Sequence, residues 1–177
     1  MPDYPLCRCP AGQCLLHPSL TTCGMREPTP ETPDGQTLAF TYDARTRNIW
    51  TLSMKDRAAR AWVKSDTAYE TAPRFSPDGH WIAYDSRESG HDEVYVRPYP
   101  GPSGKWQIST GGGLFPLWRG DGREIFYLTP DRKVMAVEVS AGTEFQAGVP
   151  KLLFQTRARR ALGRQYDVTG DGQRFLV

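Results

Sequence analysis

The chain has little cysteine, no long apolar run and no sustained helical pattern. All four cysteines lie before residue 24 of the 177, so cysteine usage says little about the redox compartment. The chain lacks any stretch of about 18 consecutive apolar residues, which predicts no membrane segment in it. The 15 prolines and 17 glycines interrupt most candidate helices. The net charge of +2 is too even to indicate a nucleic-acid partner.

A turn of the form Pro/Gly-Asp-Gly occurs four times, each time before a short run of β-branched and aromatic residues. The turns span residues 33–35, 77–79, 120–122 and 170–172, at steps of 44, 43 and 50 residues. A repeat of roughly 40–50 residues that holds several short strands is typical of a β-propeller blade. We therefore expect an all-β fold, an arc of four-stranded antiparallel blades with about three blades and the start of a fourth.

The second and third repeats can each be divided into four strands. In the second repeat the expected strands are 72–76, 81–86, 93–97 and 106–109, and in the third they are 114–118, 125–129, 134–139 and 149–154. The strands carry apolar residues on both faces, which predicts that each blade is covered by neighbours on both sides. Trp81, Trp106 and Trp118 recur at blade positions and are expected in packing between blades rather than in a ligand cage. The segment Lys55 to Ala61 is interpreted as a loop.

The turn residues are interpreted as structural. Glycine accepts a positive φ, and each aspartate is expected to accept backbone N–H groups across its own turn. The aspartates lack the dense D-x-D-x-D spacing of a calcium loop. A valine at Gly79 should therefore destabilise the module by about a kilocalorie per mole or more. The residues assigned this role are Asp34, Gly35, Asp78, Gly79, Asp121, Gly122, Asp171 and Gly172.

No catalytic motif is recognisable in the chain. His80 and His91 fall in a turn and a loop without a serine or cysteine partner at a known spacing, and each is expected at the surface. Glu88 and Asp92 could form a carboxylate pair, but nothing places a general acid opposite them. The glycines at 111–113 precede a strand rather than a helix and are interpreted as a blade-to-blade turn. We expect no catalytic, cofactor or metal site in this chain.

The N-terminal residues 1–31 do not belong to the repeat. Cys7, Cys9, Cys14 and Cys23 are spaced unlike the paired knuckles of zinc sites, although zinc or a disulfide pair stays an alternative. The prolines of this region favour an irregular or disordered leader, and no secretion signal is readable. A second local feature is a basic run between the third and fourth repeats, interpreted as a solvated loop rather than a phosphate contact. Its residues are Arg157, Arg159, Arg160 and Arg164.

Residues 32–177 resemble a known repeat family. The segments 73–84 (PRFSPDGHWIAY) and 93–98 (EVYVRP) are similar to the WD-repeat-like propeller repeat of the TolB family. The segments 95–102, 105–113, 166–169 and 174–177 resemble the C-terminal propellers attached to bacterial transmembrane serine/threonine kinases. These motifs are fairly specific to the fold and much less specific to a function. The resemblance implies a periplasmic or extracytoplasmic location, which the chain alone leaves unknown.

The resemblance also implies a closed ring of six or more blades, which needs well over 250 residues at this period. An arc exposes a blade face at each end, so the chain is interpreted as a fragment of a larger propeller or as a short product that needs a partner copy. The function favoured is a non-catalytic module that binds a protein or small ligand, as the sensor region of a kinase or as a TolB-like scaffold. Self-association through the open faces is a further expectation. The alternative is the propeller of a prolyl-oligopeptidase-type serine hydrolase.

Overall fold

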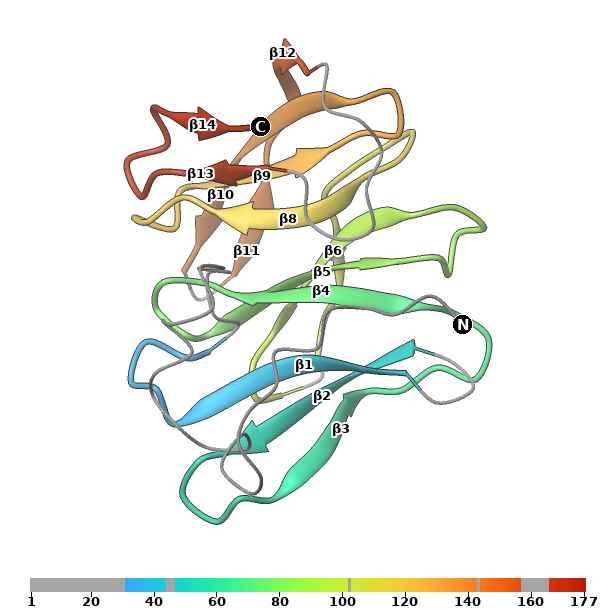
Figure 1. Ribbon diagram of the computed structural model, residues 1–177, viewed down its shortest axis with the longest axis vertical. Helices are drawn as coiled ribbons and strands as arrows, with labels where there is room; N and C mark the ends of the chain where they lie inside the picture. The colour runs from blue at the N-terminus through green and yellow to red at the C-terminus, as the bar shows by residue number, and fades with distance from the viewer. Residues whose placement is uncertain (1–30, 44–46, 102, 143, 157–165) are drawn as a thin grey trace, which may run out of the picture.

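The computed structural model describes residues 31–43, 47–101, 103–142, 144–156 and 166–177, and these residues form strands and turns without a helix. The predicted leader with its four cysteines and the predicted arginine loop lie outside the described residues, apart from Glu31. The described part of the chain contains no helix long and apolar enough to cross a membrane. The strands form antiparallel sheets that follow one another in chain order (Figure 1).

Three sheets and a two-stranded hairpin make up the row. The first sheet is β1 (Thr37–Asp43), β2 (Arg47–Ser53) and β3 (Ala59–Val63), and the second is β4 (Glu70–Phe75), β5 (Trp81–Ser86), β6 (Glu93–Pro98) and β7 (Trp106–Gln107). The third is β8 (Leu114–Trp118), β9 (Glu124–Leu128), β10 (Lys133–Ala141), β12 (Lys151–Gln155) and the added strand β11 (Phe145–Ala147). The hairpin is β13 (Asp167–Val168) and β14 (Phe175–Leu176). The predicted arc of blades is confirmed, and we number its members blades 1 to 4.

One expectation about a single segment is wrong, and one strand was not foreseen. Residues 59–61 were expected in a loop, but they begin β3 and pair with β2. Their local preference for a strand is weak, and the strand forms because β2 supplies hydrogen-bond partners. No strand was assigned to the connection before the last strand of blade 3, yet Phe145–Ala147 folds back as β11 onto the end of β10. Phe145 becomes buried there and packs on Trp81 and Trp106 of blade 2. A single apolar side chain therefore explains why this longer connection is ordered.

The cores of the molecule lie between the blades. The β5 and β6 side chains Trp81 and Val94 pack with Ile125 of β9 and Val137 of β10, so one cluster joins blades 2 and 3. Smaller clusters join blade 1 to blade 2 and blade 3 to blade 4. The Trp118 indole N–H of blade 3 also donates to the Arg74 carbonyl of blade 2 at 3.1 Å. Burial on both faces of β5 and β9 confirms the reading of their continuous apolar runs.

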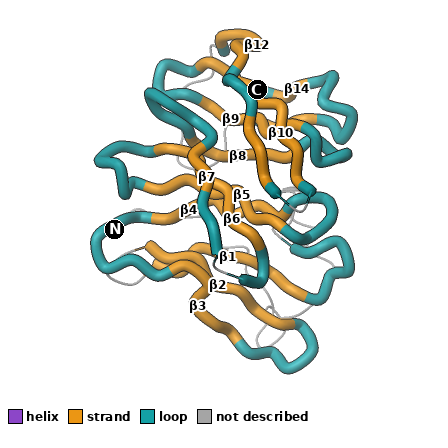
Figure 2. Tube along the Cα trace, turned by 180° about the vertical axis from the view of Figure 1, so that it is seen from behind, coloured by secondary structure: helices purple, strands orange, loops and turns teal. Residues whose placement is uncertain are grey.

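Strands β1, β4, β8 and β13 follow one another along the row (Figure 1), and the first three are seen in the same order from behind (Figure 2). By its place after the turn, β1 corresponds to β5 and β9, the second strands of their blades, whereas β4, β8 and β13 are inner strands that precede their turns. The inner strands β4 and β8 each contain a bulge, where Ala72 (φ 51°) and Phe115 (φ 55°) adopt the left-handed conformation. The buried Asp85 carboxylate on β5 accepts the Thr71 hydroxyl and, at 3.1 Å, the Phe115 N–H of the next blade. One carboxylate therefore ties the two bulges together and joins blade 2 to blade 3.

Candidate functional site

In blades 2, 3 and 4 the Asp-Gly turn joins the first two strands, and in blade 1 it leads into β1 from the bridge between Glu31 and Leu38. The four turns lie at one edge of the row, which we call the turn face. In each turn the aspartate Oδ1 accepts the backbone N–H two residues later, at 3.0 Å from Gln36, 3.1 Å from His80, 3.0 Å from Arg123 and 3.0 Å from Gln173. The four glycines have φ values of 66°, 75°, 73° and 73°. Each turn thus presents the same rigid shape to solvent.

Consecutive turns pack on one another. A Cβ added to Gly79 would lie 2.9 Å from Pro33 Cδ of blade 1, and one added to Gly122 would lie 3.6 Å from Pro77 Cδ of blade 2. In blade 4 a Cβ on Gly172 would lie 2.9 Å from Arg119 Cδ of blade 3. Gly79 and Gly172 are therefore needed for close approach as well as for their φ, whereas at Gly122 only the φ requires glycine.

The third turn differs from the others because an arginine precedes it. Blades 1, 2 and 4 place a threonine or serine hydroxyl there, which accepts the backbone N–H five residues later. In blade 3, Arg119 donates from Nε to Asp121 Oδ1 at 2.7 Å, from Nη2 to Asp121 Oδ2 at 2.6 Å and from Nη1 to Glu124 Oε2 at 2.7 Å. This guanidinium holds two carboxylates at the centre of the turn face.

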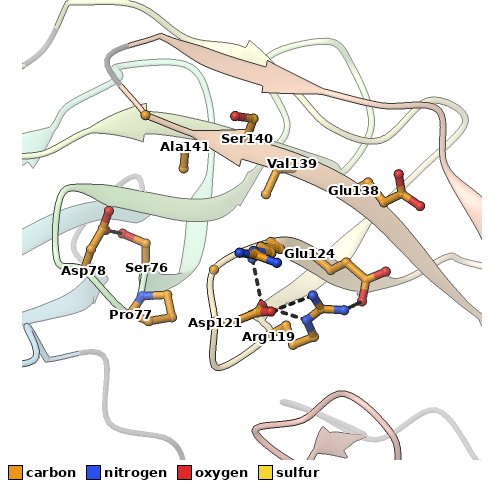
Figure 3. A pocket seen from close by; sticks show the side chains of 13 residues that line it. Ser76, Pro77, Asp78, Arg119, Asp121, Glu124, Glu138, Val139, Ser140 and Ala141 are labelled. Carbon is orange, nitrogen blue, oxygen red and sulfur yellow. Dashed lines mark hydrogen bonds and ion pairs between the residues drawn. The ribbon is translucent and has the colours of Figure 1, made fainter.

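A cavity of about 810 Å³ opens beside this arginine (Figure 3). Its walls come from the second turn, the third turn and the end of β10, so blades 2 and 3 both contribute. Four carboxylates and two guanidinium groups line it, and the net charge of the lining is −2 at neutral pH. The lining residues are Ser76, Pro77, Asp78, Arg119, Asp121, Gly122, Arg123, Glu124, Glu138, Val139, Ser140, Ala141 and Gly142.

Two of the four carboxylates that line the cavity are held ionised by their partners. The hydrogen bonds from Arg119 lower the pKa of Asp121 to about 2. The Lys151 ammonium, 2.6 Å from Glu138 Oε1, lowers the pKa of that carboxyl as well. The exposed Asp78, Arg123 and Ser140 carry further polar groups that a ligand can reach. Asp121 and Glu138 therefore stay charged below the pH at which an unpaired carboxyl group takes up its proton.

The cavity does not contain the groups that covalent catalysis requires. The Ser76 hydroxyl donates to Asp78 and accepts the Trp81 N–H at 3.0 Å, so it is buried in its own turn. No histidine or cysteine is among the described residues that line the cavity, and no base activates Ser140.

A second cavity, of about 390 Å³, is lined by residues of all four blades. Thr32, Arg74, Trp118 and Asp167 each come from a different blade.

The remaining residues considered from the sequence lie apart. His80 is exposed. Glu88 pairs with Lys105, and Asp92 accepts the Arg87 guanidinium at 2.7 Å, so the two carboxylates form separate ion pairs. Among the described residues, no group of three or more His, Cys, Asp or Glu side chains could hold a metal ion.

A buried carboxylate that sequence reasoning missed organises the glycine turn at 111–113. Glu93 Oε1 accepts the N–H groups of Gly111 and Gly112, both at 2.9 Å, and its Oε2 accepts the Ser109 hydroxyl. His91 Nε2 lies 2.8 Å from Glu93 Oε1. The two amides form an anion-binding concavity that the chain fills with its own glutamate. No spacing signal could have revealed this partner, since it lies 18 residues away.

Two turns of the same chemistry were also missed. Thr129 donates to Asp131 at 2.5 Å in the turn between β9 and β10, and Arg132 (φ 66°) occupies the glycine position. Arg57 (φ 55°) has the same role between β2 and β3, where Asp56 accepts the Ala58 N–H at 3.2 Å. The Thr-Pro-Asp start of the first of these turns was the available signal.

Comparisons with known proteins identify relatives of part of the chain. No family model matches it. The chain is 33% identical over 94 residues to tricorn protease homolog 1 of Streptomyces coelicolor, covering 51% of this chain and 8% of that protein. It is 30% identical over 102 residues to the uncharacterized peptidase YuxL of Bacillus subtilis, covering 52% of this chain and 15% of that protein. The chain thus spans less than a sixth of either relative.

Solved structures with the same fold include TolB from Acinetobacter baumannii, with a TM-score of 0.60, 17% identity, and coverage of 81% of this chain and 35% of that one. Oligogalacturonate lyase from Vibrio parahaemolyticus matches with a TM-score of 0.52 and 16% identity, covering 78% of this chain and 37% of that one. At these identities the likeness shows the fold alone. The chain therefore has the fold of part of a TolB-like β-propeller.

Proposed function

We propose that this arc is a non-catalytic recognition module, which binds a protein segment or a small ligand in the turn-face cavity. The observation that carries the proposal is the composition of that cavity. Rigid turns from two blades place exposed carboxylates around about 810 Å³ of space, without a nucleophile and base in contact. Ligands in propellers are bound by loops that adjacent blades present together, and this cavity has that construction.

The charge of the lining favours a ligand that presents a cation or several hydrogen-bond donors. Arg119 is occupied by Asp121 and Glu124, whereas Asp78 projects from the neighbouring turn as a further acceptor (Figure 3). An arginine or lysine side chain of a peptide matches this arrangement, because guanidinium and ammonium groups pair with carboxylates and have no acceptors of their own. The TolB-like fold supports binding to a protein.

The experiment compares two tripeptides, Gly-Arg-Gly and Gly-Glu-Gly, by the shifts they cause in the amide resonances of the protein. We expect shifts at residues 76, 78, 119–124 and 138–142 with the arginine peptide only. A Ser140→Trp variant should abolish them by filling the cavity, while Thr67→Trp, in an exposed loop away from the cavity, should leave them unchanged. Equal shifts with both peptides, or shifts that survive Ser140→Trp, would contradict the proposal.

A second candidate function is favoured by the sequence relatives. Two of them are named as a protease homolog and a peptidase, so the arc is alternatively a propeller domain of a peptidase-type serine hydrolase. In that setting the module would control access to a catalytic domain elsewhere in the protein. The kinase sensor setting rests on the resemblance of segments such as 95–102 and has no support from the relatives.

The parent gene distinguishes these settings. A downstream domain with a Gly-x-Ser-x-Gly motif supports the hydrolase, and an upstream kinase with a membrane span supports the sensor and an extracytoplasmic location. Purified chain should hydrolyse no peptide substrate in either setting. Hydrolysis of a fluorogenic peptide by this chain alone would overturn its assignment as non-catalytic.

A further inference from the structure

Blade 1 has an outer apolar face that no described strand covers. Leu38, Phe40 and Tyr42 point to this side of β1, and their partners Leu52 and Trp50 lie directly opposite on β2. The alternate residues of the two strands, including Ala39 and Ile49, face blade 2 and are fully buried. Tyr42 is 50% exposed, and its ring lies 5.3 Å from that of Trp50. We call these five residues the outer face.

The equivalent residues of the next two blades are completely covered. Leu38 lies four residues after the turn aspartate, as do Ile82 and Ile125, which are both 0% exposed. Phe40 lies six residues after it, as do Tyr84 and Tyr127, which are both 1% exposed. In blades 2 and 3 the cover is the preceding blade of this chain. Phe40 and Leu38 are only partly buried, because blade 1 is the first in the described row.

The series of turns that pack on one another begins at the same end, with the turn of blade 1. Gly79, Gly122 and Gly172 each approach the turn of the preceding blade, as described above, whereas a Cβ on Gly35 would meet nothing within 4 Å. The first blade therefore has both parts of the blade-to-blade interface, the apolar face and the turn glycine, and within the described ranges no neighbour uses them as elsewhere in the row. This surface is a continuation of an interface that occurs three times within the chain.

The opposite end of the row carries the other exposed apolar groups. A cavity of about 610 Å³ opens there between blade 3 and β14, lined by Phe126, Leu153 and Phe175 among others. Seven of the eight large apolar residues that are exposed in the described chain lie at one of the two ends; the exception is Tyr69. At this end they are Val149 (80%), Leu152 (55%), Leu153 (43%), Leu176 (76%) and Val177 (52%).

We propose that the outer face of blade 1 is an interaction surface for the C-terminal end of a second copy of this chain. The contact is head-to-tail, since it repeats the order in which one blade follows another, and two copies joined at both ends form a closed ring. Three aromatic and two leucine side chains, already partly covered, bury on the order of 400 Å² here, about half of the roughly 800 Å² per partner of a stable interface. The turns and neighbouring edges supply the rest.

The test is the molar mass in solution, measured by light scattering over a range of protein concentrations. Wild type should have twice the chain mass of 19.9 kDa. A face variant, Phe40→Ser with Trp50→Ser, and an end variant, Leu153→Ser with Leu176→Ser, should each be monomeric with an unchanged circular dichroism spectrum. The control Tyr69→Ser removes an exposed aromatic group away from both ends and should stay dimeric.

Mixing the two variants tests the head-to-tail geometry. A mixture retains one intact contact and should recover dimer, whereas each variant alone retains none. Dimerisation that survives the end variant would indicate face-to-face pairing and would overturn the proposal, as would a monomeric wild type or a dimeric face variant. Hydroxyl-radical oxidation of Tyr42 and Trp50 in wild type, which needs no variant to fold, should fall as concentration rises. Protection already present in a monomer would mean that something other than a second copy covers the face.

Discussion

Replacement of Gly79 by valine tests the turn geometry and the contact between blades together. Gly79 has φ 75°, and a Cβ there would lie 2.9 Å from Pro33 Cδ of blade 1. The left-handed conformation costs a residue with a Cβ about 1–2 kcal/mol, and a β-branched residue at least as much. Displacing the Pro33 ring adds about 1–3 kcal/mol. We expect the free energy of unfolding to fall by about 2–5 kcal/mol.

The matched control is Gly90→Val in the turn between β5 and β6. Gly90 also has a positive φ, 95°, but a Cβ there meets nothing within 4 Å. This variant should lose about 1–2 kcal/mol, the cost of the backbone conformation alone. Both free energies come from urea denaturation at one protein concentration, followed by circular dichroism. Equal losses would refute the packing of one turn on the next, and an unchanged Gly79→Val would refute the turn geometry itself.

Burial raises the pKa of Asp85 to about 7, so the folded protein keeps a proton that the unfolded chain releases above about pH 4. The free energy of unfolding should therefore fall by about 2 kcal/mol from about pH 5.5 to 8. Thermal melting at each pH should show a weaker fall for Asp85→Asn. Burial, together with the nearby Glu88, raises the pKa of Glu70 to about 7 as well, so part of the pH dependence should remain in that variant. Glu93→Ala should lower the free energy of unfolding by about 3 kcal/mol because one buried and one part-buried glycine amide lose their acceptor, while Glu93→Gln, which still accepts, should lose less in the same urea assay. His80→Ala should leave peptide binding and the melting temperature unchanged, and a loss of binding measured by the amide shifts would reopen a functional role for this histidine.

Much of the fold could be predicted because its signals are local. The strands 81–86 and 114–118 were expected within the bounds that the structure has, since their apolar runs directly adjoin recognisable turns. Residues 59–61 were missed, because Ala59, Arg60 and Ala61 have little β preference and form a strand only through pairing with β2. The turn at Thr129 was missed because Arg132 adopts the conformation that glycine usually provides.

The candidate site was less predictable than the fold. The turn residues Asp78 and Asp121 were singled out for their place in the repeat, but their common cavity depends on how two blades stack. Arg119 is one residue away from a predicted turn, and its position between Asp121 and Glu124 follows only from the coordinates. The link from Asp85 to the Phe115 amide spans 30 residues and leaves no pattern in the sequence.

The sequence by itself determined the period, the turns and the all-β class, because a positive φ at glycine, the side-chain bonds of aspartate and short continuous apolar runs act over a few residues. Tertiary structure decided which of the repeated positions are covered. Phe40 and Tyr84 lie six residues after equivalent turns, yet Tyr84 is buried and Phe40 is partly exposed. Burial depends on the neighbouring blade rather than on local sequence, and only the position of each blade in the row supplies or removes that neighbour.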